Sequence, residues 1–176
     1  MSESRFWELI NYSRESAASD KEFLVALKEY LVACSPEEIV GFEICLGKAL
    51  IQADHFNLVG AKKILDGSVT DDGYLYFRCW VVSLGREVFH SAIDDPDILV
   101  KYVDLKSFNE LEELLYVATA AYSTVTNIAE EDETFPRSVR FDSGIDYDFN
   151  LEGPKGEDWK KADLPNRFPG LWALRH

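Results

Sequence analysis

One cluster of side chains in the sequence has the residue types and spacing to do chemistry. Asp71 and Asp72 precede a long apolar segment, Arg78 lies within it, and Arg86 and Glu87 follow it. Arginine side chains bind carboxylate and phosphate groups through paired hydrogen bonds, and an aspartate can accept a proton. The pattern predicts a small polar pocket in which the arginines hold an anionic group and an aspartate acts as a base.

The same cluster also fits a purely structural role, and the sequence leaves both interpretations open. An arginine on an otherwise apolar helix needs carboxylate or carbonyl partners, because an unpaired buried charge is costly. In this interpretation Asp72 caps the helix, and Arg78 pairs with an internal carboxylate such as Asp54 or Glu43. In this interpretation the side chains of Arg86 and Glu87 lie in solvent.

Acidic residues form a second group of candidates. The chain has 32 Asp and Glu residues against 18 Lys and Arg residues, which gives a formal net charge of −14. This charge argues against direct nucleic-acid binding, which depends on Lys and Arg displacing counterions from phosphates. It would speed association with a basic protein. The acidic face that we predict for such a partner comprises Asp94, Asp95, Asp97, Glu110, Glu112, Glu113, Glu130, Glu131, Asp132 and Glu133.

Aromatic side chains could anchor a basic partner on this acidic face if they are exposed. The candidates are Tyr116, Tyr122, Trp159 and Trp172. The plainer alternative is a solvated surface, because net charge also keeps proteins soluble.

Neither a metal nor a cofactor is expected. His55, His90 and His176 are scattered, and no Cys or His pair has the spacing of metal ligands. His55, at a helix junction, is expected to cap or pack. The sequence contains no Gly-rich phosphate loop, nucleophile elbow or Cys/His catalytic signature, so nothing in it supports an enzyme directly.

The elements that must position these residues are helices, because apolar residues recur with a helical period from residue 4 to 127. Ser35-Pro36-Glu37-Glu38 predicts a capped helix start, with Ser35 as the cap and Glu38 completing a capping box. A short helix over about 57–65 should end at Gly67, and Asp71 or Asp72 should cap the next one.

The helix over 72–84 is apolar on nearly every side, which is typical of a helix packed against several neighbours. Gly85 marks its end or a break, and Arg86 shares a side with Arg78 only if the helix continues past that glycine. The last long helix is expected over about 108–127, with acids near its start, where the helix dipole favours them.

Beyond Asn127 the composition changes to turn residues with isolated aromatics. We therefore predict a helical domain over 1–127 and an irregular C-terminal extension over 128–176 that packs on the same domain. A short strand could form where Ile145, Tyr147 and Phe149 alternate with aspartates. The predicted fold class is all-α, or nearly so: an orthogonal bundle of about seven helices around the central buried one.

Several segments resemble a bacterial family of unknown function, DUF4240. They are Phe6-Trp7-x-Leu9-Ile10, Ser35-Pro36-Glu37-Glu38-Ile39, Gly85-Arg86-Glu87-Val88-Phe89 and, above all, Asp71-Asp72-Gly73-Tyr74-Leu75-Tyr76-Phe77-Arg78-Cys79-Trp80. The resemblance covers about residues 4–125 and does not extend to the tail. It implies a helical bacterial domain and supplies no known catalytic residues.

Location and function follow as expectations from these features. The start of the chain lacks the apolar core of a secretory peptide, and the three cysteines sit in apolar segments without close pairing, so we expect a cytoplasmic protein. The leading functional prediction is a non-enzymatic interaction module, inhibitor-like as immunity proteins are, or regulatory, that binds a basic partner. The alternative is an enzyme or small-anion-binding protein that uses the Asp/Arg cluster. The sequence leaves the oligomeric state open.

Overall fold

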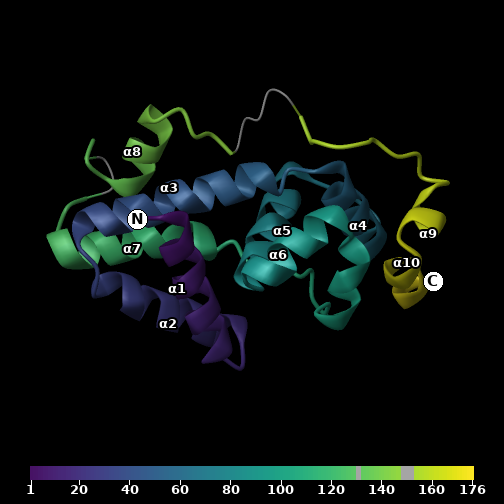
Figure 1. The fold of residues 1–176 in the computed structure, drawn as a ribbon, viewed down its shortest axis with the longest axis horizontal. Helices are drawn as coiled ribbons and strands as arrows, with labels where there is room; N and C mark the ends of the chain where they lie inside the picture. Colours follow the sequence, from purple (N-terminus) through teal and green to yellow (C-terminus); the bar gives the residue numbers. More distant parts are fainter. Residues whose placement is uncertain (130–131, 148–152) are drawn as a thin grey trace.

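The computed structural model describes residues 1–129, 132–147 and 153–176 (Figure 1). In this part of the chain the secondary structure is helical without a strand, which confirms the all-α prediction. No helix within the described ranges is long and apolar enough to cross a membrane. The elements are α1 Glu3–Glu15, α2 Asp20–Val32, α3 Pro36–Gln52, α4 Phe56–Asp66, α5 Asp71–Ser83, α6 Arg86–Asp94, the 3-10 helix η1 Pro96–Lys101, α7 Leu114–Thr126, α8 Pro136–Asp142, α9 Leu164–Arg167 and α10 Pro169–Arg175.

Local capping residues set several helix ends where the sequence places them. The Ser35 hydroxyl accepts a hydrogen bond from the Glu38 amide, and the Glu38 carboxylate accepts one from the Ser35 amide, so the predicted capping box is confirmed. Gly67 ends α4 in the left-handed conformation with φ of 76°. At the start of α4, His55 Nδ1 accepts from the Asn57 amide, which confirms the capping role expected for this histidine.

The cap of α5 differs from the prediction. Thr70, rather than Asp71 or Asp72, is the N-cap residue, and its hydroxyl accepts a hydrogen bond from the Gly73 amide at 3.2 Å. Both aspartates instead lie in the first turn, where the helix dipole favours a negative charge. At the other end Gly85 adopts φ of 95° and starts α6, so α5 and α6 are separate helices.

α5 is buried, as predicted, but it shares the central position with α3. α5 packs against α1, α3, α4 and α6, and Phe77, Cys79, Val81 and Val82 of α5 are fully buried. α3 packs against α1, α5, α7 and α8. Figure 1 shows α3 running along the molecule from the group of α1, α2 and α7 to the group of α4, α5 and α6.

α7 begins at Leu114, six residues later than predicted. Asn109 has a left-handed backbone with φ of 49°, which a continuing helix cannot accommodate. The next residue, Glu110, is held by Lys62 of α4 at 2.5 Å. A tertiary ion pair therefore overrides the helical pattern of this segment.

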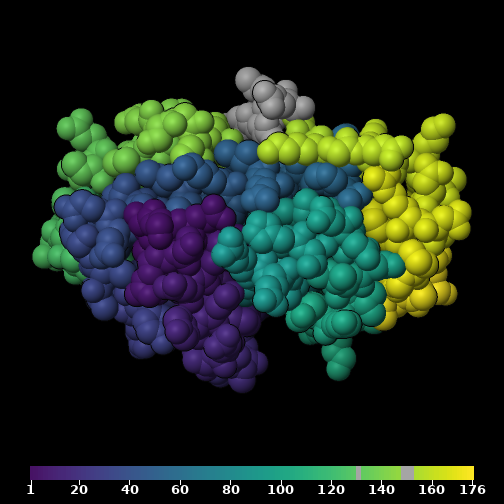
Figure 2. Space-filling model, in the orientation of Figure 1, coloured from purple at the N-terminus to yellow at the C-terminus, as the bar shows by residue number. Residues whose placement is uncertain are grey.

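The C-terminal part is more helical than the sequence suggested, because α8, α9 and α10 lie where irregular structure was predicted. Each begins with a proline at its first or second position. Proline in this position is typical of a helix start, and the prediction did not use it. α8 packs on α3, and α10 packs on α4 and η1 (Figure 2). Residues 145–147 form no strand, and Phe149 lies outside the described residues.

Candidate functional site

A pocket of about 720 Å³ opens beside the first half of α5. It brings together Asp71, Asp72 and Arg78 of the predicted cluster. The walls come from the junction of α3 and α4, from α7 and α8, and from the chain on either side of residues 148–152. The lining residues are Asp54, Val59, Val69, Asp71, Asp72, Tyr74, Leu75, Tyr76, Arg78, Leu115, Tyr116, Arg137, Tyr147, Gly153 and Pro154.

Tyr74 fixes α5 against the α3–α4 junction, and thereby fixes this side of the pocket. Its hydroxyl accepts from the His55 amide at 3.1 Å and donates to the Ala53 carbonyl at 3.2 Å. Burial raises the pKa of Tyr74, so the phenol remains protonated and keeps donating at neutral pH. Arg78 lies one helical turn further along the same face of α5.

Arg78 is 5% exposed and is held by main-chain oxygens. Nη1 donates to the Leu50 carbonyl at 2.9 Å and Nη2 to the Tyr147 carbonyl at 3.4 Å, while the guanidinium carbon lies 4.9 Å from the Tyr74 ring centroid. The buried Nε has no hydrogen-bond partner among the described residues. Of the two carboxylates suggested as partners of Arg78, Glu43 forms an ion pair with Arg140 of α8, and Asp54 lines the same pocket as Arg78.

Arg137 supplies a second guanidinium that the sequence analysis missed. It lies in the first turn of α8, donates to the Leu115 carbonyl at 3.4 Å, and sits 5.4 Å from the Tyr116 ring centroid. Arg137 is far from α5 in the sequence, in a segment predicted to be irregular. Pro136 as a helix start, followed by arginines at 137 and 140, is the signal that could have pointed to it.

Carboxylates and phenols complete the pocket. Asp71 and Asp72 are exposed at the rim, while Asp54 is buried. Burial raises the pKa of Tyr76 to about 12, and the Glu112 carboxylate contributes to this shift. The pocket therefore combines two cationic groups, three acidic residues and protonated tyrosines, a mixture that can bind both an anionic group and hydrogen-bond donors.

The other two residues of the predicted cluster lie elsewhere. Arg86 and Glu87 are exposed at the start of α6 and do not line the pocket. Arg86 has its Nη2 3.9 Å from a carboxylate oxygen of Glu3, and its backbone amide donates to Asn11. The break at Gly85 is the physical reason, since it turns the chain away from the axis of α5.

The structure spreads the residues of the predicted acidic face over separate elements. Asp94, Asp95 and Asp97 lie at the junction of α6 and η1, whereas Asp132 and Glu133 precede α8, near the opposite end of the molecule (Figure 1). Glu113 is exposed and Glu112 half-buried at the start of α7. Glu130 and Glu131 lie outside the described residues.

Several of these acids already hold parts of the fold. The Asp97 carboxylate accepts hydrogen bonds from the Gly170 and Leu171 amides at 2.8 and 2.9 Å, and so caps α10. Asp132 accepts from the Thr134 amide and hydroxyl, and these bonds lower the pKa of Asp132. Glu110 binds Lys62.

Of the four predicted aromatic anchors, only Tyr116 is well exposed, at 44%. Tyr122 is buried, and Trp159 and Trp172 are half-buried. The Trp159 indole donates to the Phe56 carbonyl at 2.7 Å, so it anchors the C-terminal segment to α4.

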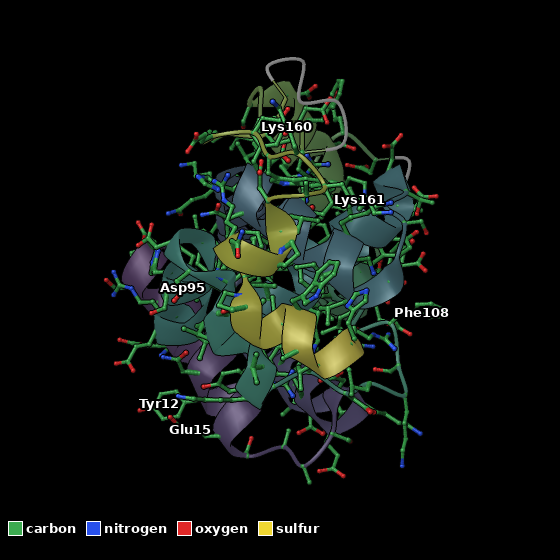
Figure 3. All side chains as sticks on the ribbon, turned by 90° about the vertical axis from the view of Figure 1, so that its right-hand side faces the viewer. Tyr12, Glu15, Asp95, Phe108, Lys160 and Lys161 are labelled. Carbon is green, nitrogen blue, oxygen red and sulfur yellow. The ribbon has the colours of Figure 1, made fainter. Side chains whose placement is uncertain are left out.

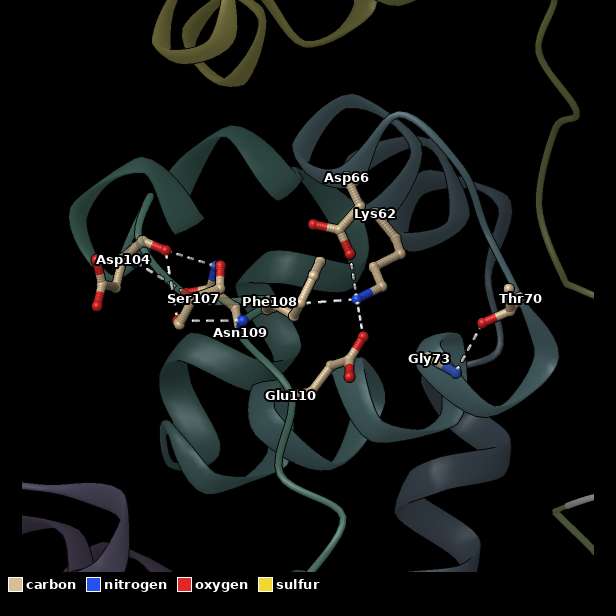
Figure 4. Close-up of polar contacts among 9 residues, drawn as sticks. All are labelled: Lys62, Asp66, Thr70, Gly73, Asp104, Ser107, Phe108, Asn109 and Glu110. Carbon is tan, nitrogen blue, oxygen red and sulfur yellow. Dashed lines mark hydrogen bonds and ion pairs between the residues drawn. The ribbon is translucent and has the colours of Figure 1, made fainter.

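A buried lysine cluster is the second feature that sequence reasoning missed. Lys62 is 2% exposed and binds Asp66 and Glu110, each at 2.5 Å, and its ammonium also donates to the Phe108 carbonyl at 3.3 Å (Figure 4). Asp66 follows Lys62 by one helical turn, which is a visible signal, but the Glu110 partner is set by tertiary structure. The cluster attaches the 102–110 loop to α4.

Possible metal ligands and His55 are the remaining candidates that the sequence raised. The described ranges contain no group of three or more His, Cys, Asp or Glu side chains placed to hold a metal ion. Burial lowers the pKa of His55, whose Nδ1 is occupied by its capping bond.

The comparisons with known proteins extend the resemblance seen in the sequence. Neither the search of curated proteins nor the search of solved structures gave a match. The family model described as "Protein of unknown function (DUF4240)" matches residues 1–124. That range includes Asp71, Asp72 and Arg78 but not Arg137, Tyr147 or Gly153. Because the match spans well over half of the chain, the protein belongs to the DUF4240 family.

Proposed function

We propose that the protein binds a small ligand with an anionic group in the pocket beside α5. The observations that carry this proposal are that Arg78 lines the pocket and that its buried Nε lacks a hydrogen-bond partner among the described residues. A buried donor without a partner is costly, and a native protein rarely keeps one unless water or a ligand satisfies it. A carboxylate or phosphate oxygen is the acceptor that best complements a guanidinium.

The remaining lining residues support a ligand that has more than a bare anion. Tyr74 and Tyr116 place their rings beside the guanidinium groups of Arg78 and Arg137, and Tyr147 also lines the pocket. Asp71 and Asp72 would accept hydrogen bonds from the ligand at the rim, or a proton if the bound molecule is transformed. A pocket of about 720 Å³ has the size of the cavities that hold small organic molecules.

A thermal-shift screen of small carboxylates and phosphate esters tests this proposal. Any ligand that raises the melting temperature of the wild type is then measured with Arg78→Gln and Arg137→Gln. Arg86→Gln is the matched control, because it removes the same charge from an exposed site outside the pocket. We expect at least about tenfold weaker binding for the two pocket variants, since charge-assisted hydrogen bonds each contribute roughly 1.5–3 kcal/mol, and unchanged binding for the control. Equal binding by all three variants would contradict the proposal.

We propose a second role, binding of a basic protein partner, on the basis of the net charge of −14 and the exposed carboxylates at Asp94, Asp95, Glu113, Asp132 and Glu133. The setting that we propose is the bacterial cytoplasm, which the free cysteines Cys34 and Cys45 support. The test is capture from a native lysate at low salt, followed by reconstitution with the purified partner. A complex that a modest rise in salt dissociates is the expected result, and a salt-insensitive complex would contradict an electrostatic interface.

A further inference from the structure

A second pocket, of about 600 Å³, lies beside the C-terminal half of α5. It runs between the α1–α2 junction and the loop over residues 102–110, with Trp80 and Leu84 of α5 in its wall. We call it the loop groove. Its lining residues are Arg14, Ala18, Ser19, Asp20, Trp80, Leu84, Tyr102, Asp104, Ser107, Phe108, Asn109 and Glu110.

Internal hydrogen bonds fix the 102–110 loop in one shape. The Asn109 side chain is buried, accepts from the Asp104 amide at 2.8 Å, and donates to the carbonyls of Asp104 and Ser107. Its own backbone takes the left-handed conformation that asparagine tolerates better than most residues. The Phe108 carbonyl is held by Lys62 from the other side (Figure 4). The loop is therefore held both by its own hydrogen bonds and by Lys62 of α4.

This hydrogen-bonded loop exposes three large apolar side chains within seven residues. Phe108 is 67% exposed, Tyr102 44% and Leu105 42%. Figure 3 shows Phe108 at the periphery of the molecule, pointing away from its body. Exposed aromatic residues grouped on a rigid element are typical of binding surfaces, because little conformational entropy is lost when a partner covers them.

The charge around the loop groove points to the kind of partner. Three carboxylates line it, from Asp20, Asp104 and Glu110, against the single guanidinium of Arg14. Asp20 binds Arg14 at 2.9 Å, and Glu110 shares Lys62 with Asp66. Asp104 is the groove carboxylate that forms no ion pair among the described residues, and the exposed Lys106 follows it in the loop. An added positive charge in the groove would therefore be attracted to Asp104.

From this combination we infer that the loop groove docks a segment of a partner protein that carries a large apolar side chain next to lysine or arginine. The apolar side chain packs on Phe108 and Tyr102, and the basic one lies near Asp20 and Asp104. This inference rests on the second proposed function, to which it adds a location and a recognition chemistry. It is independent of the pocket that contains Arg78.

The test is selection of a phage-displayed library of random dodecapeptides on the wild-type protein at low salt. The enriched peptides are synthesised with a fluorescent label, and their binding is measured by anisotropy. Phe108→Ser removes the exposed ring. The matched control is Phe141→Ser, because the Phe141 side chain is 61% exposed and lies on α8, outside the groove. Both side chains are mainly in solvent, so neither change disturbs the core.

We expect the enriched peptides to carry a large apolar residue beside Lys or Arg. Phe108→Ser should bind them at least about tenfold more weakly than the wild type, as for the loss of a single hot-spot residue. Phe141→Ser should bind them as the wild type does. Basic peptides that bind Phe108→Ser as well as they bind the wild type would overturn the loop groove and leave the second proposed function in place. Enriched peptides without basic residues would overturn both.

Discussion

Among the described residues, the two buried arginines, Arg78 and Arg140, have different hydrogen-bond partners. Arg140 is 3% exposed, and its Nε donates to the Glu43 carboxylate at 3.1 Å. Its guanidinium carbon also lies 4.1 Å from the Tyr147 ring centroid. Arg78 has carbonyl partners and a remaining donor. A paired buried charge stabilises the contact between α3 and α8, whereas the remaining donor of Arg78 is suited to a ligand.

Removal of the Glu43 carboxylate should therefore destabilise the protein strongly. Glu43→Ala leaves the Arg140 charge buried without its carboxylate, which we expect to lower the free energy of unfolding by about 3–5 kcal/mol. Glu8→Ala, which breaks the exposed pair with Arg5, is the control and should cost less than about 1 kcal/mol. Urea unfolding of the three proteins measures both changes. Equal stability of the two variants would show that the buried pair is not structural.

His55 should make the stability depend on pH, because its neutral form accepts the capping bond of α4. Burial lowers the pKa of His55 in the folded state, so the unfolded chain binds the proton more readily. The contribution of this residue is fully present above the unfolded pKa of about 6.5 and is lost as the pH falls through the folded value. His55→Asn keeps a capping side chain that does not titrate. Its stability should fall less than that of the wild type between pH 7 and 5.

At the scale of elements, the sequence predicts a helix boundary best where a local signal marks the start or the end of the helix. The Ser35 capping box, Gly67 and the break at Gly85 depend on neighbours within a few residues, and all three lie where the pattern places them. The start of α7 depends instead on Lys62, which is distant in the sequence. A local pattern cannot contain that information.

The candidate site was predictable only in part, for the same reason. Asp71, Asp72 and Arg78 share one helix, so their spacing already places them together. Arg137 comes from α8, a seven-residue helix that packs on α3 and α7, and helices this short are marginal in isolation. The placement of Arg137 in the pocket is therefore a tertiary property.

The C-terminal segment is attached by backbone hydrogen bonds between Lys155 and the junction of α3 and α4. The Lys155 amide donates to the Asp54 carbonyl, and the Phe56 amide donates to the Lys155 carbonyl, both at 2.9 Å. Next to this bridge Gly156 has φ of 83°, and a Cβ there would collide with the His55 ring. Gly144 has φ of 74°, and a Cβ there would meet no described atom within 4 Å. An alanine at Gly144 therefore adds backbone strain without a collision, which makes it the control for Gly156.

Gly156→Ala should therefore loosen residues 153–176, whereas Gly144→Ala should only strain the backbone. Left-handed alanine costs about 1–2 kcal/mol at either position, and the collision adds to this at Gly156. Limited proteolysis reads out the difference, with faster cleavage within 153–176 expected for Gly156→Ala alone. Identical cleavage of both variants would contradict docking through this glycine.

At the scale of the whole molecule, the pocket joins two parts of the chain. Its α5 wall lies within the range matched by the family, while Arg137, Tyr147, Gly153 and Pro154 lie beyond it. The C-terminal part of the chain therefore helps to build the candidate site in addition to covering the helices. The loop groove, in contrast, is built by residues 14–110, all within the matched range.

The most direct test of ligand binding at Arg78 is an NMR titration that observes the arginine Nε–H groups of ¹⁵N-labelled protein. The probes are the carboxylates and phosphate esters that stabilise the protein in the thermal-shift screen, with Arg78→Gln, Arg137→Gln and Arg86→Gln used to assign the signals. We expect a bound ligand to shift the Arg78 and Arg137 signals and to slow hydrogen exchange at Arg78 Nε, while the Arg86 signal stays in place. Binding that leaves the Arg78 signal unchanged would contradict the proposed site.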